Sequence, residues 1–338
     1  MNARTRIIAL LSLVAAAANM VSPALADPLP GRDLLKFSQR PMDATPVGGA
    51  LYWGHDEIST AYAPVSTVVP APPTIYRGDF MADDFADTFS TPVVHVKWWG
   101  SYLNHTNVSG GHIQKFMIAF EQDVPTPNLL GFSYPDPNGP IFSQIVTLGA
   151  LSPQSGTFTE KFVSPGGPPL GEELYEYNAE LKLPFAQQKD TVHWLKIVAL
   201  VDQVPGTPAP IWGWHNRDYT QQNLSASPNV APGENLQGNA ASGPVWHFQD
   251  DAVSGKVDIG TFINTAGVQQ IAAVQQNLTS YNDENYINNL DGPPGIGAFS
   301  KDLAFELYTV QIPEPASCLL MAVGLAGSLF ARRRMRNS

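Results

Sequence analysis

The stretch VHWLKIVALV, residues 192–201, says more about the fold than any other part of this sequence. Only His193 and Lys196 interrupt its apolar side chains, and turn-forming residues lie on both sides. A short apolar run of this kind is typical of a β-strand that is buried on both faces. We therefore expect residues 192–201 to form a central strand.

Outward from this run, similar short runs recur in both directions, separated by Gly- and Pro-rich turns. They are Val93–Trp99, Ile113–Glu121, Ile141–Leu148, Thr157–Val163, Leu174–Leu183, Ile211–Trp214, Val245–Phe248 and Leu303–Val310. No helices alternate with them, so the pattern predicts an all-β fold. The expected architecture is an antiparallel β-sandwich or jelly roll over residues 76–311. The last run is expected to pair with an early one.

Two segments depart from this pattern. Val268, Ile271, Val274 and Leu278 recur at three-to-four spacing, which predicts one amphipathic helix. Residues 27–75 are rich in Pro, Ala, Ser and Thr, and are interpreted as an extended segment before the sandwich.

The charge distribution indicates which partners suit the body of the protein. The chain has 19 basic and 30 acidic residues, and six of the basic ones but only one acidic one lie in the terminal segments. Residues 27–312 therefore carry 13 basic and 29 acidic residues, a net charge of −16. Such a surface repels nucleic acid and anionic lipid, and is compatible with cations or neutral glycans.

Cysteine is absent from the body, since the single Cys318 lies in the C-terminal apolar run. The body therefore has no disulfide, no Cys-ligated zinc and no cysteine nucleophile.

The N-terminus reads as a cleavable signal peptide over residues 1–26. Arg4 and Arg6 precede an apolar run, and Ala24 and Ala26 form an Ala-x-Ala cleavage site. We expect cleavage after Ala26; the alternative is an uncleaved anchor helix.

The C-terminal segment, residues 312–338, combines a Pro-Glu-Pro triplet, a short apolar run and a basic end. The triplet is Pro313, Glu314 and Pro315, the run spans residues 316–331, and Arg332, Arg333 and Arg334 begin the basic end. At about 1.5 Å per residue the run is shorter than the hydrocarbon core of roughly 30 Å. Arginines at this end favour a cytoplasmic position. We expect membrane contact through 316–331 before processing.

This segment resembles the PEP-CTERM sorting signal of exopolysaccharide-producing Gram-negative bacteria. The resemblance implies export, recognition and removal of the tail by an exosortase-like protease, and delivery to the cell envelope or matrix. It also implies a transient inner-membrane anchor. The alternative is an ordinary C-terminal anchor.

The body is also similar to a family of uncharacterised domains in exported PEP-CTERM proteins. The similarity rests on residues 81–85, 96–102, 116–120, 193–197, 212–214 and 250–253. It extends over about residues 76–310 and implies no known activity.

Enzymatic motifs are sparse. The chain contains no His-Glu-x-x-His and no Gly-x-Ser-x-Gly. His105 and His112 are interpreted as solvated loop residues, and Ser101 as a strand residue without a triad. Glycoside hydrolysis through two carboxylates stays open, because acidic residues such as Glu172, Glu173 and Glu176 are plentiful.

Two binding hypotheses follow from the side chains. Asp83, Asp84 and Asp302 form the hypothesis for a structural calcium site, if the first and last strands are neighbours. A solvated acidic surface is the alternative.

The aromatic side chains give the second hypothesis, a polysaccharide-stacking platform. It comprises Trp98, Trp99, Tyr102, Trp212, Trp214 and Tyr219. Adjacent strand residues face opposite sides, so Trp98 and Trp99 are expected to diverge, whereas Trp212 and Trp214 share a face. The alternative is that these rings fill the core.

These observations favour a non-enzymatic surface or matrix protein that binds exopolysaccharide. The alternatives are a secreted polysaccharide hydrolase and a purely structural matrix protein.

Overall fold

The computed structural model describes a β-rich domain built from segments along most of the chain. The described residues are 33–41, 56–64, 74–151, 156–164, 173–217, 227, 233–235, 244–246, 252–263, 269–280, 284–285, 298–299 and 302–310. Ala24 and Ala26 of the expected signal peptide and the segment 312–338 lie outside these ranges.

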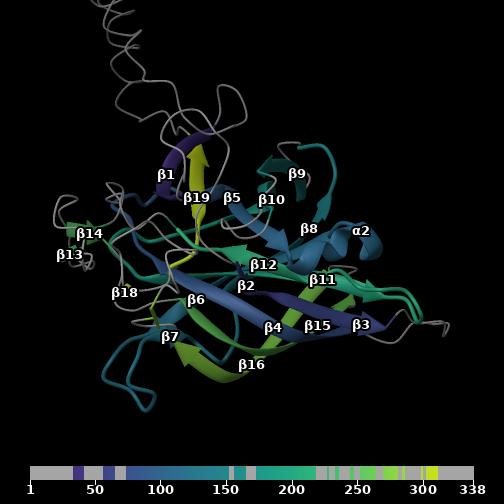
Figure 1. The fold of residues 1–338 in the computed structure, drawn as a ribbon. Coiled ribbons are helices and arrows are strands. Elements are labelled where there is room, and N and C mark those ends of the chain that lie inside the picture. Colours follow the sequence, from purple (N-terminus) through teal and green to yellow (C-terminus); the bar gives the residue numbers. More distant parts are fainter. Residues whose placement is uncertain are drawn as a thin grey trace, which may run out of the picture.

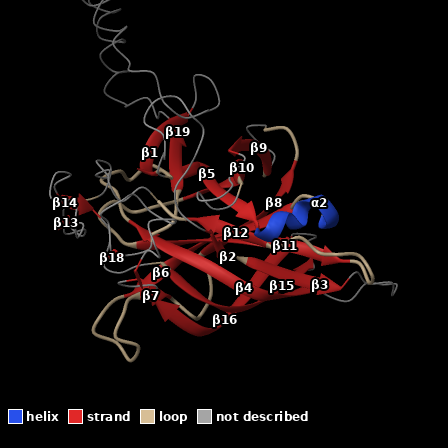
Figure 2. Cartoon of the chain, in the orientation of Figure 1, coloured by secondary structure: helices blue, strands red, loops and turns tan. Residues whose placement is uncertain are grey.

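Strands dominate the described residues, and the all-β prediction is confirmed (Figure 1, Figure 2). In chain order they are β1 (Asp33–Gln39), β2 (Asp56–Ile58), β3 (Thr60–Pro64), β4 (Thr74–Phe85), β5 (Val93–Tyr102), β6 (Lys115–Val124), β7 (Tyr134–Pro135), β8 (Phe142–Leu148), β9 (Thr157–Ser164) and β10 (Leu174–Phe185). They continue with β11 (His193–Gln203), β12 (Trp212–His215), β13 (Gly233–Asn235), β14 (Pro244–Trp246), β15 (Val253–Ile263), β16 (Gln269–Ser280), β17 (Glu284–Asn285), β18 (Ala298–Phe299) and β19 (Phe305–Val310). Every strand predicted from the sequence overlaps one of these.

Helical structure among the described residues is confined to two short segments. They are η1 (Leu103–His105) and α2 (Thr106–Gly110), which lie together at one end of the domain (Figure 2). Neither has the length or the apolar character to cross a membrane.

Fifteen strands form one mixed sheet that folds back on itself. Its main order is β1-β19-β5-β10-β9-β8-β6-β11-β3-β4-β15-β16, with β12 beside β5 and β2, and β7 beside β6. In Figure 1 the group of β1, β19, β5 and β10 lies on one side of β6, β11 and β4. The pairs β11–β3 and β8–β9 are parallel and the other pairings are antiparallel, so the sheet is mixed, consistent with the predicted all-β sandwich.

Strand β11 explains why the apolar run 192–201 decides this fold. Leu195 and Ile197 pack in the core between the two layers, whereas Trp194 and Val198 pack in a second core on the other face. The second core also contains side chains of β15 and β16. A strand with apolar layers on both faces needs apolar side chains at successive positions, as its sequence has.

The described strands before residue 76 belong to the folded domain, which corrects the boundary expected there. Strand β1 pairs with β19, and β3 pairs with both β11 and β4. Phe37 of β1 is fully buried. The local composition resembled a linker, but pairing with distant strands supplies the backbone hydrogen bonds that keep these residues extended.

The helix expected around residues 268–278 is wrong, because residues 269–280 form strand β16, paired with β15, while Val268 lies outside the described residues. Ile271 and Leu278 pack on the second core, but Val274 is 54% exposed. A register shift lies opposite Gly255, and Asn277 has a positive φ of 56°. The bulge shifts the alternation by one residue and so imitates helical spacing.

The two ends of the described domain are neighbours, as predicted. β19 lies between β1 and β5, and both pairings are antiparallel. The last strand is therefore flanked by the first strand of the domain.

Candidate functional site

The tryptophans of the expected binding platform are core residues. Trp98, Trp212 and Trp214 are fully buried between the two layers, and Trp98 stacks on Tyr177 with 5.4 Å between ring centroids. Trp99 points to the other face, where it is 2% exposed. The expected divergence of Trp98 and Trp99 is confirmed.

These positions correct the platform hypothesis. Tyr102 is also fully buried, and Tyr219 lies outside the described residues. Burial of large rings removes apolar area from water and so stabilises the fold. These rings therefore stabilise the core and are not accessible to a ligand. No stacking surface is formed by these five buried rings.

The acidic trio is brought together only in part. Asp83 accepts hydrogen bonds from Gln39 Nε2 at 2.6 Å and from the Leu303 amide at 2.7 Å. Asp302 forms a 2.8 Å ion pair with Arg217. Burial, and next the charge of Asp302, raise the pKa of Asp83 well above its ordinary value. Asp83 and Asp302 therefore lie close together, although β4 and β19 are not paired in the sheet.

Asp84 points away from the other two. The neighbours Met81 and Phe85 of β4 belong to the core between the layers, whereas Phe80 and Ala82 belong to the second core. Asp84 follows the even-numbered positions by strand alternation. Three side chains on two faces of a sheet do not converge on one ion, so the calcium trio was wrong as a set.

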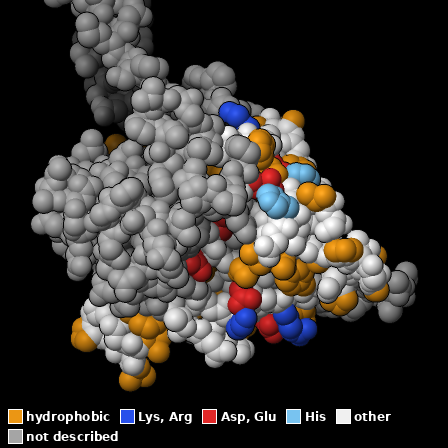
Figure 3. All heavy atoms as spheres, viewed as in Figure 1, with side chains coloured by type: hydrophobic (Ala, Val, Ile, Leu, Met, Phe, Trp, Pro, Cys, Tyr) orange, Lys and Arg blue, Asp and Glu red, His pale blue; other side chains and the backbone are white. Residues whose placement is uncertain are grey.

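A partly exposed cluster, here called the His–Glu surface, lies where β5, β9 and β10 end. It comprises His105, His112, Glu160, Phe162, Glu173 and Tyr175. Figure 3 shows histidine side chains on one face of the molecule among hydrophobic and acidic ones. The His112 side chain is 47% exposed and Phe162 is 52% exposed. These residues were not predicted as a binding site.

Strand register assembles the aromatic part of this surface. Tyr175 of β10 lies opposite Phe162 of β9, and their rings meet edge to face at 5.4 Å. Two residues along, Tyr177 lies opposite Glu160 on the same face. The core face of this layer therefore continues outward, and its last side chains reach solvent.

The loop between β5 and β6 supplies the two histidines. Asn104 and His105 have positive φ angles of 49° and 55°, in the left-handed region that non-glycine residues seldom adopt. Gly111, at φ 79°, turns the chain back toward β6. This path places the ring of His112 edge to face with Tyr102 and Tyr175.

Each carboxylate of the surface contacts one tyrosine and one histidine. Glu160 accepts a 2.6 Å hydrogen bond from Tyr102 and contacts His112 Nδ1 at 2.5 Å. Glu173 accepts a 3.1 Å hydrogen bond from Tyr175 and lies 3.5 Å from His105 Nδ1. The two carboxylates are thus held in place from two sides.

The tyrosines are fixed as hydrogen-bond donors. Burial, and next the charge of Glu173, raise the pKa of Tyr175 to about 12. Burial, and next Glu160, raise the pKa of Tyr102 further. Both hydroxyls therefore stay protonated at neutral pH.

A cleft of about 170 Å³ adjoins the surface at His112. Its other walls include Gln114, Asp202, Gln203 and Thr207. This is less than the roughly 300–1,000 Å³ of pockets that enclose a small molecule. The cleft therefore suits part of a ligand that lies across the surface.

Ser101, Asp56 and His215 form a row that is not a hydrolase triad. Ser101 donates a hydrogen bond to Asp56, and His215 Nδ1 contacts the other oxygen of Asp56 at 2.9 Å. In a triad the imidazole contacts the serine hydroxyl. Here the carboxylate lies between the two, in line with the interpretation of Ser101 as a strand residue.

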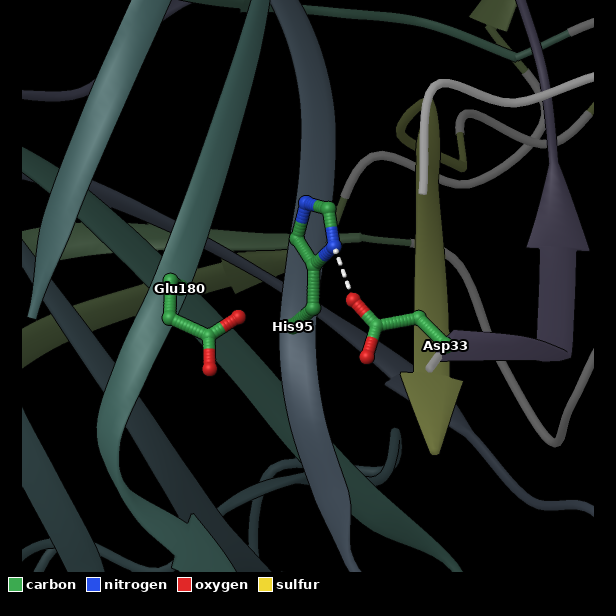
Figure 4. Close-up of side chains that lie close together, drawn as sticks. All are labelled: Asp33, His95 and Glu180. Atoms are coloured by element: carbon green, nitrogen blue, oxygen red, sulfur yellow. Dashed lines mark hydrogen bonds and ion pairs between the residues drawn. The ribbon is translucent and has the colours of Figure 1, made fainter. Parts of the chain in front are cut away.

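A separate buried group contains one aspartate, one histidine and one glutamate. Asp33, His95 and Glu180 each offer one potential metal-ligand atom, and these three atoms lie within 4.8 Å of one another. Figure 4 shows the two carboxylates on opposite sides of the imidazole. Sequence spacing could not have revealed this group, because its members come from three strands that are far apart in the sequence.

Comparison with known proteins gave two family matches. A family described as a domain of unknown function (DUF7901) matches residues 35–253. The PEP-CTERM protein-sorting motif matches residues 311–334, in agreement with the resemblance seen in the sequence. No curated protein matches, and no solved structure matches.

Proposed function

We propose that this chain, which belongs to the family of the domain of unknown function DUF7901 and carries a PEP-CTERM sorting motif, is a non-enzymatic surface protein. Its proposed ligand is polysaccharide, bound through the His–Glu surface. The motif means exosortase-dependent sorting to the cell surface. The folded domain is therefore delivered to a compartment where polysaccharides are abundant ligands.

The observation that carries the proposal is the exposed Phe162 ring, continued by Tyr175 and His112 and bordered by Glu160 and Glu173. Flat rings pack against the C–H faces of sugar rings, while carboxylates and imidazoles bond to sugar hydroxyls. A net charge of −16 over residues 27–312 favours a neutral or basic glycan over an anionic one.

The hydrogen bonds support binding over hydrolysis. Both oxygens of Glu160 already contact donors, Tyr102 on one side and His112 on the other. A glycosidase needs one carboxyl group that gives its proton to the leaving oxygen and a second that faces the sugar. A carboxylate held by two partners is better suited to orienting a bound hydroxyl.

The test is the retention of the exported protein, purified from the cell surface or medium, on exopolysaccharide from its own host. Phe162→Ala and His112→Ala are expected to weaken binding roughly tenfold each, which corresponds to the loss of about 1.4 kcal/mol. Phe89→Ala is the matched control, because Phe89 is 44% exposed and lies outside the His–Glu surface.

Three outcomes would contradict the proposal in different ways. Release of sugar products that depends on Glu160 or Glu173 would identify a hydrolase. Absence of any glycan retention would favour a purely structural role. Equal losses in the Phe89 and Phe162 variants would mean that binding occurs elsewhere.

A further inference from the structure

One face of the sheet carries a small group of side chains whose nitrogen and oxygen atoms could bind a metal ion. Asp33 begins β1, His95 lies in β5, and Glu180 lies opposite His95 in β10. Strand β19 lies between β1 and β5. Four neighbouring strands thus bring residues 33, 95 and 180 into one row, which Figure 4 shows from the side.

Burial makes this row unusual. The side chains of Asp33 and His95 are both 0% exposed, and Glu180 is 0% exposed as a residue. Transfer of an ionised carboxylate into a protein interior is costly unless positive charge or hydrogen bonds compensate it. A row of two buried carboxylates and one imidazole therefore offers oxygen and nitrogen atoms of the kind that bind a cation.

The imidazole of His95 is held in position. Its Nδ1 contacts Asp33 Oδ2 at 3.0 Å, and the ring stacks on Tyr308 at 4.9 Å between centroids. Its Nε2 is buried and has no hydrogen-bond partner among the described residues. A buried imidazole nitrogen without a partner is expensive, and a metal ion is a common reason for one.

We propose that Asp33, His95 and Glu180 bind a divalent transition-metal ion, with Zn²⁺ as the first candidate. Mixed oxygen and nitrogen donors are ligands that Zn²⁺ accepts, usually in four-coordinate geometry. Within the described residues this is the one group of three or more such side chains with converging donor atoms.

Binding would draw the three groups together. Zinc–ligand distances of about 2.0–2.2 Å place donor atoms closer to each other than the 4.8 Å limit that they satisfy here. The ion would therefore connect β1 to β5 and β10 across β19. Its expected effect is to stabilise the attachment of the first strand.

The experiment measures metal content and thermal unfolding of the exported protein, purified without chelators. We expect about one equivalent of bound metal, loss of that metal in EDTA, and a fall of roughly 5 °C in Tm that Zn²⁺ reverses. His95→Gln and Glu180→Gln should each abolish both the metal and the EDTA effect.

Two control variants locate the metal. His193→Gln replaces a histidine that is also buried, at 6% exposure, but lies in another region, and it should retain the metal. His112→Gln tests the exposed histidine of the His–Glu surface and should also retain it. If His95→Gln does not fold, Asp33→Asn at the first residue of β1 gives the same comparison.

The inference is overturned if the purified protein neither contains metal nor changes its Tm with EDTA or added Zn²⁺. It is equally overturned if folded Glu180→Gln protein keeps a full equivalent. Glycan retention through Phe162 is independent of these results, so failure here leaves the proposed function untouched.

Discussion

Lys196 is an ammonium group enclosed in the second core of the domain. Its Nζ lies 2.6 Å from Glu121 Oε1 and 2.6 Å from Gln275 Oε1, and 4.3 Å from the centroid of the Phe80 ring. Both members of the ion pair are 0% exposed. Burial lowers the pKa of Lys196, and Glu121 acts in the opposite direction. Strand β16 is tied to β6 and β11 through this group.

Removal of one partner should be much more harmful than removal of both. Lys196→Met leaves Glu121 as an uncompensated buried charge, and we expect the free energy of unfolding to fall by about 3–5 kcal/mol in urea denaturation. Lys256→Met is the control, because its ion pair with Asp79 is exposed and should matter by less than about 1 kcal/mol. The double variant with Glu121→Met should recover part of the loss; equal losses in single and double variants would contradict this explanation.

His193 should make stability depend on pH. Burial lowers its pKa from 6.5 to about 4, in a site beside the rings of Phe85 and Phe185. The unfolded chain takes up this proton near pH 6.5, whereas the folded state does so only near pH 4. Stability should therefore decrease as the pH falls through that window, by up to about 3 kcal/mol from this residue.

The measurement compares unfolding free energies at pH 7 and pH 4.5 in two variants. His193→Gln should show a smaller difference than the wild-type protein. Val274→Ala, which changes an exposed side chain without a titratable group, should retain the wild-type difference. An unchanged pH dependence in His193→Gln would show that other groups cause it.

Strands β5 and β12 lie very close together at Gly100. A Cβ atom there would lie 2.2 Å from the Gly213 carbonyl oxygen and 2.5 Å from the Trp212 ring. Backbone of one strand cannot yield at this distance without breaking the pairing of Gly100 with Trp214. The crossing therefore requires a residue without a side chain.

Gly100→Ala should destabilise the domain by about 1–3 kcal/mol through overpacking. Gly149→Ala is the matched control, because its nearest neighbour, Thr157 Cγ2, would lie at an ordinary 3.6 Å. Thermal unfolding of the two variants gives the comparison. Similar Tm values would show that β12 can shift away from β5 at little cost.

Strand β16 shows that a local apolar pattern can predict the wrong secondary structure. Spacing of three to four between Ile271, Val274 and Leu278 predicts a helix, yet the segment pairs with β15 along its length. The bulge at Asn277 changes the face that later residues occupy. A short apolar pattern does not distinguish a helix from a bulged strand, because the distinction lies in the partner strand.

For the whole molecule, the first strand is part of the core rather than an appendage. Phe37 stacks on Phe305 of the last strand at 5.3 Å and contacts Phe85 at 5.7 Å. Strand β1 and the last strand therefore belong to one folded unit. Composition alone indicated a linker.

Two substitutions in β1 test this arrangement. Phe37→Ala should lower the free energy of unfolding by about 3–5 kcal/mol, because it leaves a cavity between two layers. Leu34→Ala in the same strand should have a small effect, since Leu34 is 48% exposed. If both variants unfold like the wild-type protein, the domain does not depend on β1.

Some residues of the candidate site were recognisable in the sequence, but their contacts with one another were not. His105 and His112 were recognisable as loop histidines, but their contacts with Glu173 and Glu160 were not. A clue was present in β10, where Tyr175 and Tyr177 occupy alternate positions that lead from the core toward the edge. Which carboxylates face them depends on the register with β9, and register is not encoded in either strand alone.

The sorting motif and most of the strands were predictable from the amino-acid sequence. A sorting tail works as a linear signal, and strand alternation is a local property, so both can be recognised without knowledge of the fold. The burial of Trp98, Trp212 and Trp214 in the core, and the meeting of Asp33, His95 and Glu180, became visible in the folded structure alone. The physical reason is that burial and convergence depend on which distant strands become neighbours, and the order of strands in a sheet is set by the packing of the whole chain.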